Sequence, residues 1–507
     1  MRSDVASSPA GAPLVSHPRL TLKPALRAPV HYASPVYSDA VTRYALDVSR
    51  AGSAGDGAFH GEAGDLGCGD QLRIELAVED ARIVRARHRS FACPHATAAA
   101  ALCCRLAEGT GLLDAARIGA SRLEQELRPA NHNRECVALA ADALHAAIAR
   151  ALDSGTLERA ENRVAVAMSG GVDSAVALLK AVEAGLEPVG VTLRLWIDPA
   201  APDSERACCS PQSVRAARSA CHAAGVPHVT LDLRRRFRSQ IVDAFVRDHA
   251  AGQTPNPCVR CNGSFRFDAL AEFADRIGAD RIATGHYARV VERDGHRLIA
   301  RGADPDKDQS YMLARVPEQI VRRVWFPLGE QRKQLTREQA RGAGLAAAER
   351  RESQEVCFVG GGDHRQFVER YGGAGRPGQI VAGDGRVLGE HDGVHRFTPG
   401  QRRGLGIGGG EALFVVSTDA ASGTVVAGPR SALARTEIRV SPGRLRVPAA
   451  RVHAKLRYRS PAMAASVRVE GDGFVLELDE PAYGVAPGQA AVLYDGDTVV
   501  GAGLIAR

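Results

Sequence analysis

Apolar and polar residues alternate along 71–90, on both sides of an Asp-containing turn. A period of two is typical of strands with one buried face, so this stretch predicts a β-hairpin. The segments 95–109 and 135–152 instead repeat apolar residues three and four positions apart, which predicts helices. Because strands come first and helices follow, we expect a small α+β domain over 36–152.

A different order begins after the polar segment 153–163, which we interpret as a linker. An apolar β-branched run leads into Ser-Gly-Gly and a helical pattern, and a second strand pattern follows at 188–196. Strand and helix patterns keep alternating, which favours an α/β domain with a parallel sheet over 164–372. From about 375 the chain has frequent Gly, short strands and many turns, so we expect two small β-domains, 373–445 and a barrel-like 446–507.

Composition narrows the class of protein. A chain of 507 residues is too long for one core, and its 45% hydrophobic content is that of a globular protein. The sequence has no run of 18 apolar residues, so we expect no membrane span. Residues 1–35 are rich in Pro, Ala and Ser, and we expect a disordered leader there. Eleven clustered cysteines without a signal peptide indicate a reducing compartment, so we expect a cytoplasmic protein.

The chain is mildly basic, with a formal net charge of +7. Such a charge permits a nucleic-acid partner without requiring one. The densest basic run is RRRFR at 234–238. It fits either a solvated face or a contact to nucleic-acid phosphates.

The stretch 167–174 carries the strongest chemical signal. A strand pattern ends in Ser-Gly-Gly, and Val-Asp-Ser then opens a helix. Glycines let the backbone approach an anion closely, and the helix N-terminus adds N–H groups and a partial positive charge. No Gly-Lys-Ser/Thr follows, so the sequence predicts a phosphate-binding turn that differs from the Walker A loop.

A second signal is the loop TPNPCVRCN at 254–262. Pro255 and Pro257 stiffen its backbone. Cys258 and Cys261 stand at the spacing that lets one loop present two thiolates to a single centre. A zinc knuckle, a redox pair, an iron–sulfur site and a sulfur-transfer site each fit this pattern.

The region 36–152 has cysteines of its own. Cys68 comes just before the first clear strand, and Cys93 and Cys136 each stand at the start of a predicted helix. We expect thiols in a loop and at helix N-termini to have a lowered pKa and to be good ligands for soft metals.

Both halves of the chain resemble known families. Ser-Gly-Gly-x-Asp-Ser resembles the PP-loop of ATP pyrophosphatases, and 36–152 resembles the NifU-like iron–sulfur scaffold domain. Over about 160–507 the chain resembles the tRNA-specific 2-thiouridylases. The motifs that carry this resemblance are Thr-Pro-Asn-Pro at 254–257, Ala-Thr-Gly-His-Tyr-Ala-Arg at 283–289, Lys-Asp-Gln-Ser-Tyr at 307–311, Ser-Gln-Glu-Val-Cys-Phe at 353–358, Thr-x-Gly-Gln-Arg-Arg-Gly-Leu-Gly at 398–406 and Arg-Tyr-Arg at 457–459.

The thiouridylase resemblance implies an ATP-dependent tRNA-uridine 2-sulfurtransferase, which adenylates the wobble uridine, releases AMP and pyrophosphate and leaves sulfur at C2. It implies that Cys357 carries a persulfide, that Cys261 is the nucleophile paired with it, and that Asp173 helps to hold Mg²⁺. The implied ATP contacts are Ala167, Met168, Ser169, Gly170, Gly171, Val172, Asp173, Ser174, Leu193 and Gly285. The implied tRNA contacts are Asn256, Pro257, Cys258, Lys307, Asp308, Gln309, Arg457 and Tyr458.

The NifU-like resemblance implies a metal centre that holds an iron–sulfur cluster or zinc. Its implied ligands are Cys68, Asp70, Cys93 and Cys136. Glu135 stands where that family often has His, which leaves the cluster type open. The implied partners are tRNA and a cysteine desulfurase or sulfur carrier as the sulfur donor.

One departure from the family pattern opens a second mechanism. Cys258 stands at a position that is usually Asp in the 2-thiouridylases, so Cys258, Cys261 and Cys357 could hold a 4Fe–4S cluster with one iron open to sulfide. Otherwise Cys258 is a spectator or a disulfide partner. A rival interpretation of the whole chain is an iron–sulfur assembly scaffold without thiolase activity. The complete Ser-Gly-Gly-Val-Asp-Ser counts against it.

Overall fold

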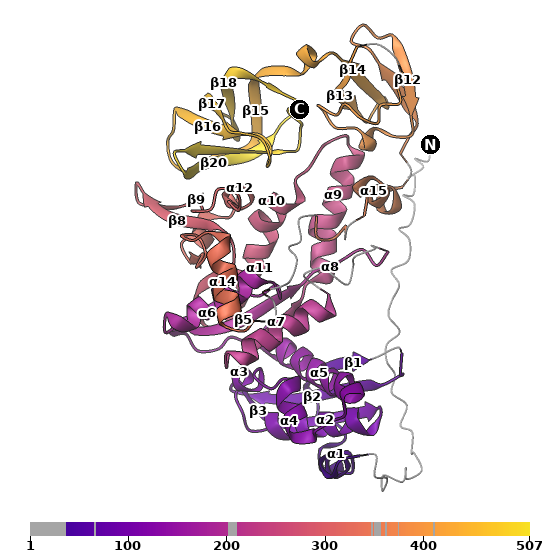
Figure 1. Cartoon of the computed structure of the whole chain (residues 1–507), viewed down its shortest axis with the longest axis vertical. Helices are drawn as coiled ribbons and strands as arrows, with labels where there is room; N and C mark the ends of the chain where they lie inside the picture. Colours follow the sequence, from indigo (N-terminus) through magenta and orange to yellow (C-terminus); the bar gives the residue numbers. More distant parts are fainter. Residues whose placement is uncertain are drawn as a thin grey trace, which may run out of the picture.

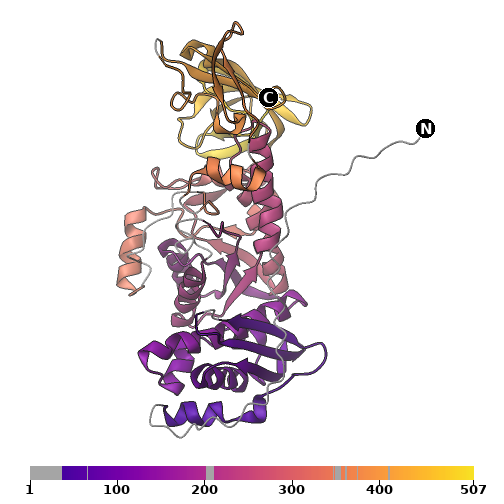
Figure 2. The same cartoon turned by 90° about the vertical axis from the view of Figure 1, so that its right-hand side faces the viewer.

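The structure is a computed structural model that describes residues 37–64, 67–200, 210–345, 348, 356–359, 362–373, 375–408 and 411–507. The leader expected at 1–35 lies outside these residues. The α+β domain lies at one end of the molecule, the parallel-sheet domain in the middle and the two β-domains at the other end (Figures 1 and 2). The predicted fold class is therefore confirmed.

The N-terminal domain is an antiparallel sheet of order β1-β2-β3 covered by helices. The predicted hairpin is present, and its turn residues Asp80 and Ala81 have φ angles of 46° and 60°. Positive φ at both turn positions matches the twist of the two flanking strands. The elements are α1 (Asp39–Ala45), β1 (Phe59–Gly64), β2 (Gln71–Glu79), β3 (Arg82–Phe91), α2 (Pro94–Ala107), α3 (Leu112–Ala115), α4 (Ala120–Leu127) and α5 (Arg134–Asp153).

The central domain contains a parallel sheet of order β10-β7-β4-β5-β6. Its strands are β4 (Ala160–Ala167), β5 (Glu187–Arg194), β6 (His228–Asp232), β7 (Ala279–Thr284) and β10 (Val324–Trp325). Strand order reverses around β4, and ligands of such sheets bind beyond the carboxyl ends of the strands at that point. The helices are α6 (Val172–Glu183), α7 (Pro211–Ala223), α8 (Arg234–Phe237), α9 (Asp243–Ala250), α10 (Pro257–Cys261), α11 (Phe267–Arg276), α12 (Ser310–Leu313), α13 (Glu318–Val321), α14 (Lys333–Gly342) and α15 (His364–Gly372).

The two C-terminal β-domains are built differently. The first is a sheet of β11 (Gly378–Val381), β12 (Val387–His391), β13 (Phe414–Asp419) and β14 (Thr424–Gly428). The second is closed by pairing of β15 with β20, and the hairpin of β8 (Ala288–Arg293) and β9 (His296–Arg301) joins it through β20. Its strands are β15 (Ala434–Leu445), β16 (Arg451–Lys455), β17 (Met463–Glu470), β18 (Gly473–Tyr483), β19 (Ala490–Asp495) and β20 (Thr498–Ile505). The sequence analysis placed the boundary between the two β-domains after residue 445, the last residue of β15. Because β15 pairs with β18 and β20, it belongs to the barrel.

Helix α5 packs directly on the central domain. Asp142 of α5 accepts hydrogen bonds from Arg215 of α7 (Nε at 3.0 Å, Nη2 at 2.8 Å) and from Arg218 (Nη1 at 2.6 Å). The ring of His145, which is buried, lies with Nδ1 3.2 Å from the carbonyl oxygen of His228 in β6. The N-terminal domain is therefore held by a buried polar contact in addition to its chain connection.

The connection between the two domains is shorter than the linker expected from the sequence. Helix α5 ends at Asp153 and strand β4 begins at Ala160, so only 154–159 join them. The backbone N–H of Leu157 donates to the carbonyl of Arg276 at 2.7 Å. Residues 160–163, which the sequence assigned to the linker, instead form the first part of β4, a strand inside the parallel sheet.

Candidate functional site

The stretch 167–174 forms a tight turn between β4 and α6. The backbone N–H of Met168 donates to Val191 of β5 at 2.8 Å, so the turn leaves the sheet at the carboxyl end of β4. Gly170 has φ of 74°, which favours glycine. The hydroxyl of Ser174 donates to the carbonyl of Gly171 at 2.9 Å and accepts from the N–H of Ser169 at 3.2 Å. The predicted turn is therefore present at the N-terminus of α6, where free N–H groups favour an anion, and its binding of phosphate remains a prediction.

Two other predicted nucleotide contacts lie at the same edge of the sheet. Leu193 is near the end of β5, which pairs with β4. Gly285 follows β7, the other neighbour of β4. A Cβ atom on Gly285 would lie 2.7 Å from the carbonyl carbon of Asp173, so only glycine lets the two backbones pass this closely.

A lysine that the sequence analysis did not identify holds the carboxylate of the turn. Lys333 Nζ lies 2.7 Å from both oxygens of Asp173, and Lys333 is 7% exposed. The hydroxyl of Tyr287 donates to Asp173 at 2.8 Å and lies 2.8 Å from the hydroxyl of Thr336. A buried lysine beside a phosphate-binding turn supplies the positive charge that the glycine-rich turn itself lacks. The sequence marks Lys333 only by its position eight residues after Trp325, the last residue of strand β10 of the parallel sheet.

The Cys-x-x-Cys segment, expected to be a loop, forms the short helix α10 (Pro257–Cys261), which begins at Pro257. Asn256 caps helix α10, because its side-chain oxygen accepts from the N–H groups of Cys258 (3.1 Å) and Val259 (3.2 Å). Cys261 is buried and Cys258 is half-buried. Burial raises the pKa of the Cys258 thiol, and the nearby Cys261 raises it further.

This segment is also attached to the C-terminal barrel. The N–H of Thr254 donates to the carbonyl of Pro487 at 2.9 Å, and Gln489 Nε2 donates to the carbonyl of Thr254 at 2.6 Å. The chain just before α10 is therefore held by the barrel, while Cys261 itself is buried in the core of the central domain.

Cys357 is half-buried at the start of an aromatic cluster. The next residue, Phe358, packs with its ring centroid 5.3 Å from that of Phe245 and 5.4 Å from that of Phe367. Residues 353–355 of the same motif lie outside the described part of the chain. Among the described residues, the sulfur atoms of Cys258, Cys261 and Cys357 do not form a group with the spacing of metal ligands.

Besides 256–258 at the start of α10, the predicted tRNA contacts lie in two further segments. In 307–309, Asp308 accepts from the N–H of Ser310 at 3.0 Å, and Gln309 accepts from the N–H of Tyr287 at 2.9 Å, so both side chains also hold the loop. In the barrel, Arg457 donates to the carbonyl of Pro399 at 2.7 Å, while Tyr458 is 39% exposed. Their contact with tRNA remains a prediction.

The N-terminal domain brings three of its four predicted ligands together. One ligand atom from each of Asp70, Cys93 and Cys136 lies within 4.8 Å of the other two. Asp70 Oδ1 accepts from the N–H of Cys93 at 2.8 Å, and its Oδ2 is buried without a hydrogen-bond partner. Cys68 is exposed and lies outside this triple. The soft donors and the unsatisfied buried oxygen fit a metal ion or cluster.

The prediction of lowered thiol pKa values is wrong for this centre. Burial raises the pKa of Cys93 to about 12, and burial also raises the pKa of Cys136. Each position is a helix start, but removal from water outweighs the helix dipole. Glu135 pairs with Arg215 at 2.5 Å and is thus directed at the central domain.

Four family models together match most of the chain between residues 36 and 505. Residues 36–153 match the NifU-like N-terminal domain, and 162–361 match the tRNA methyl transferase HUP domain. Residues 365–429 match the tRNA methyl transferase PRC-barrel domain, and 437–505 match the aminomethyltransferase beta-barrel domain. Among the described residues, no helix is long and apolar enough to cross a membrane.

Individual proteins match over long stretches. A bifunctional protein NifU/MnmA of Rubrobacter xylanophilus is 41% identical over 93% of this chain and 99% of its own. A tRNA-specific 2-thiouridylase MnmA of Rhodospirillum centenum is 45% identical over 68% of this chain and 92% of its own. A crystal structure of the N-terminal part of a NifU-like protein from Brucella abortus matches with a TM-score of 0.21 and 18% identity over 24% of this chain and 95% of its own. Both resemblances of the sequence are confirmed, and the chain belongs to the tRNA-specific 2-thiouridylase family, in the form that also carries a NifU-like domain.

Proposed function

We propose that this protein uses ATP to transfer sulfur to C2 of the wobble uridine of tRNA, and that its N-terminal domain supplies sulfur or a cluster to that reaction. The observation that carries the proposal is the predicted phosphate-binding turn in the same domain as the short helix α10 with two thiols. The first can activate an oxygen as a leaving group, and the second can deliver the sulfur that replaces it.

In the first step, the C2 oxygen of uridine attacks the α-phosphate of ATP and pyrophosphate leaves. The N–H groups of the turn would bind the phosphates, and Lys333 would stabilise the charge that develops on them. Asp173 offers carboxylate oxygens of the kind that Mg²⁺ prefers, and the ion would neutralise phosphate charge when bound.

In the second step, the terminal sulfur of a Cys357 persulfide attacks C2, and AMP leaves with the former C2 oxygen. The Cys261 thiolate then attacks the Cys357 sulfur, which forms a Cys261–Cys357 disulfide and releases 2-thiouridine. An external thiol must reduce that disulfide before the next cycle. In the alternative mechanism, Cys258, Cys261 and Cys357 would hold an iron–sulfur cluster that supplies sulfide, which requires these three thiols to come closer together than they lie in this structure.

The test is mass spectrometry of tRNA after incubation with full-length protein, ATP and a sulfur donor. Cys261→Ser and Cys357→Ser should abolish 2-thiouridine while pyrophosphate release continues, because activation precedes sulfur attack. Normal thiolation by the Cys357→Ser variant would contradict the proposal that Cys357 carries the persulfide. Cys258→Ser separates the two mechanisms. If a persulfide supplies the sulfur, this variant should lose little thiolation activity. If a cluster supplies it, the variant should lose as much activity as the other two and should also lose iron.

The role of the N-terminal domain is supported by its docking through Asp142 and by the ligand triple of Asp70, Cys93 and Cys136. A full-length variant with Cys68, Cys93 and Cys136 all changed to Ser should make 2-thiouridine more slowly than wild type when the sulfur donor is limiting. Equal rates under anaerobic conditions would rule out supply within one molecule. Absence of 2-thiouridine from wild type would instead favour an assembly scaffold without thiolase activity.

A further inference from the structure

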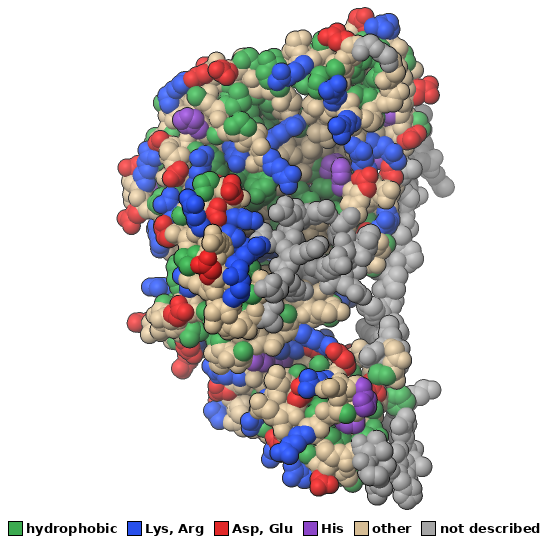
Figure 3. All heavy atoms as spheres, in the orientation of Figure 1, with side chains coloured by type: hydrophobic (Ala, Val, Ile, Leu, Met, Phe, Trp, Pro, Cys, Tyr) green, Lys and Arg blue, Asp and Glu red, His purple; other side chains and the backbone are tan. Residues whose placement is uncertain are grey.

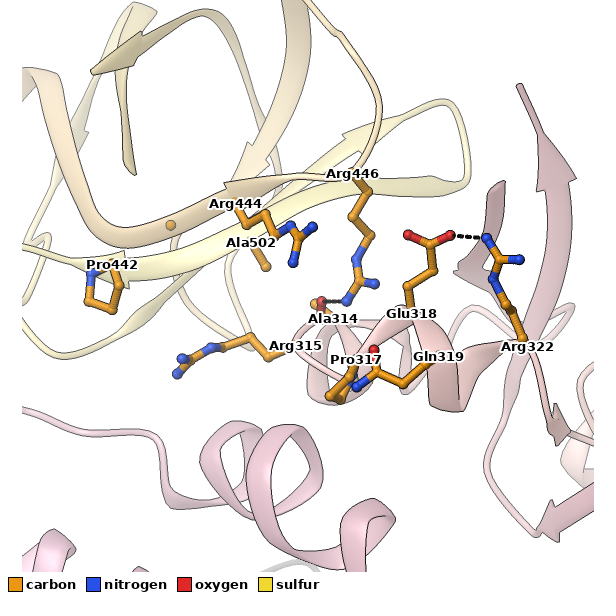
Figure 4. A pocket seen from close by; sticks show the side chains of 11 residues that line it. Ala314, Arg315, Pro317, Glu318, Gln319, Arg322, Pro442, Arg444, Arg446 and Ala502 are labelled. Atoms are coloured by element: carbon orange, nitrogen blue, oxygen red, sulfur yellow. Dashed lines mark hydrogen bonds and ion pairs between the residues drawn. The ribbon is translucent and has the colours of Figure 1, made fainter. Parts of the chain in front are cut away.

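A cavity of about 560 Å³ opens between the central domain and the barrel. On one side it is lined by the turn from α12 to α13, and on the other by the end of β15 and by β20. Figure 4 shows Arg444 and Arg446 extending from the barrel toward the side that carries Arg315 and Glu318.

The lining has far more positive than negative charge. It contains the guanidinium groups of Arg315, Arg322, Arg444 and Arg446 and a single carboxylate, that of Glu318. Glu318 forms an ion pair with Arg322, whose Nη2 lies 2.8 Å from Oε1 of Glu318. The other three cations, Arg315, Arg444 and Arg446, form no ion pair within the lining, although the charge of Glu318 also acts on Arg446.

These three cations are not equivalent. Arg446 is fixed, because its Nη2 donates to the carbonyls of Ala314 at 3.0 Å and Val316 at 2.5 Å. Among the residues that the structure describes, the guanidinium groups of Arg315 and Arg444 have no hydrogen-bond or ion-pair partner. Burial lowers the pKa of Arg315, and the charge of Arg260 adds to that effect. A bound anion would relieve this unfavourable environment.

The most basic run of the sequence, 234–238, differs from the cavity in that acidic neighbours pair with its arginines. Within 234–238, Arg234 pairs with Asp232 at 2.5 Å, and Arg236 pairs with Glu272 at 2.7 Å. That run is therefore largely neutralised by its own neighbours, whereas the arginines of the cavity are not.

The cavity adjoins the predicted tRNA-contacting loop 307–309 and the segment just after Cys261. Helix α12 begins at Ser310, directly after the loop 307–309. On its other side, a Cβ on Gly263 would lie 2.7 Å from the Cβ of Arg315, so Arg315 packs against the chain just after Cys261. Figure 3 shows Lys and Arg side chains around the hollow between the central and C-terminal domains.

We propose that this cavity binds a backbone phosphate of RNA next to the nucleotide that is modified, with Arg315 and Arg444 as the ligands of the phosphate. The inference rests on the proposed function, because it takes tRNA as the substrate. Arg446 would orient the site through its two backbone contacts. Guanidinium groups suit this task, because they present paired N–H donors to phosphate oxygens.

The test compares the affinity of full-length wild type for tRNA, over a range of salt concentrations, with that of Arg315→Gln, Arg444→Gln and the double variant. The matched control is Arg439→Gln on the same strand β15, since Arg439 already pairs with Glu470 at 3.0 Å. Each cavity variant should bind about tenfold more weakly, as for loss of one hydrogen bond to a charged group. The slope of log affinity against log salt should fall by about one for each lost contact.

Arg444→Lys should bind more tightly than Arg444→Gln, which separates charge from shape, and thermal unfolding checks that every variant is folded. Affinity and salt slope equal to the control would overturn the inference while leaving thiolation by wild type intact. Loss of thiolation with unchanged tRNA binding would also overturn it, because the cavity would then serve an acidic protein partner. Wild type that neither binds nor thiolates tRNA would overturn the proposed function as well.

Discussion

Removal of the Asp142 carboxylate should loosen the N-terminal domain from the rest of the chain. The side chain of Arg218 is 9% exposed and its Nη1 lies 2.6 Å from Asp142, so Asp142→Ala leaves a nearly buried cation without its partner. Breaking a buried pair in this way costs about 3–5 kcal/mol. We take the lower end, about 3 kcal/mol, because Asp142 itself is 27% exposed.

The neighbouring pair provides the control. Glu135 also binds Arg215, but its side chain is 75% exposed, so Glu135→Gln should cost less than about 1 kcal/mol. A double-mutant cycle of Asp142→Ala with Arg218→Met then isolates the coupling energy of the buried pair.

The assay uses the two tryptophans of the chain, Trp196 and Trp325, which both lie in the central domain. Their fluorescence reports unfolding of that domain, while circular dichroism also reports the N-terminal helices. In Asp142→Ala, the circular dichroism transition should begin at lower urea concentration, by roughly 1.5 M for a denaturant slope near 2 kcal/mol per M. A shift no larger than that of Glu135→Gln would refute the reasoning.

Three further predictions concern the nucleotide site and acid stability. Gly285→Ala should weaken ATP binding at least about tenfold, as measured by calorimetry, because its Cβ would meet the backbone of Asp173 at 2.7 Å; unchanged affinity would contradict this. Lys333→Met should slow pyrophosphate release about 10²–10³-fold, as for loss of one charge-stabilising donor, and a near-normal rate would show that Lys333 only fixes Asp173. Burial lowers the pKa of His222 to about 4, whereas the pKa in the unfolded chain is near 6.5. The contribution of neutral His222 to the free energy of unfolding is therefore complete above pH 6.5 and is lost as the pH falls toward 4. Urea unfolding should show a loss on the order of 3 kcal/mol from this residue at pH 4, and His222→Gln should reduce the acid sensitivity.

Local sequence patterns were enough to predict several of the elements and part of the candidate site. The hairpin of β2 and β3 follows from alternation along 71–90, and the phosphate-binding turn follows from residues adjacent in sequence. Lys333 could not be found in this way, since 160 residues separate it from Asp173 and only the folded sheet brings them together.

The thiols show a second limit of sequence reasoning. The positions of Cys93 and Cys136 at helix starts are local facts, and both were predicted correctly. The direction of their pKa shifts depends on how much protein covers each sulfur, which is a property of the packed domain. A metal that binds there must displace protons held by these thiols, so its affinity will rise with pH.

The contact of α5 with α7 and β6 also restricts which proteins the N-terminal domain can serve. A free-standing carrier can turn any of its faces to successive recipients. Here the face that contains Asp142 and His145 is permanently occluded by its own chain. A protein that binds the N-terminal domain must therefore approach one of its other faces. If this domain passes on sulfur or a cluster as proposed, a recipient that recognises the covered face cannot take it from this chain.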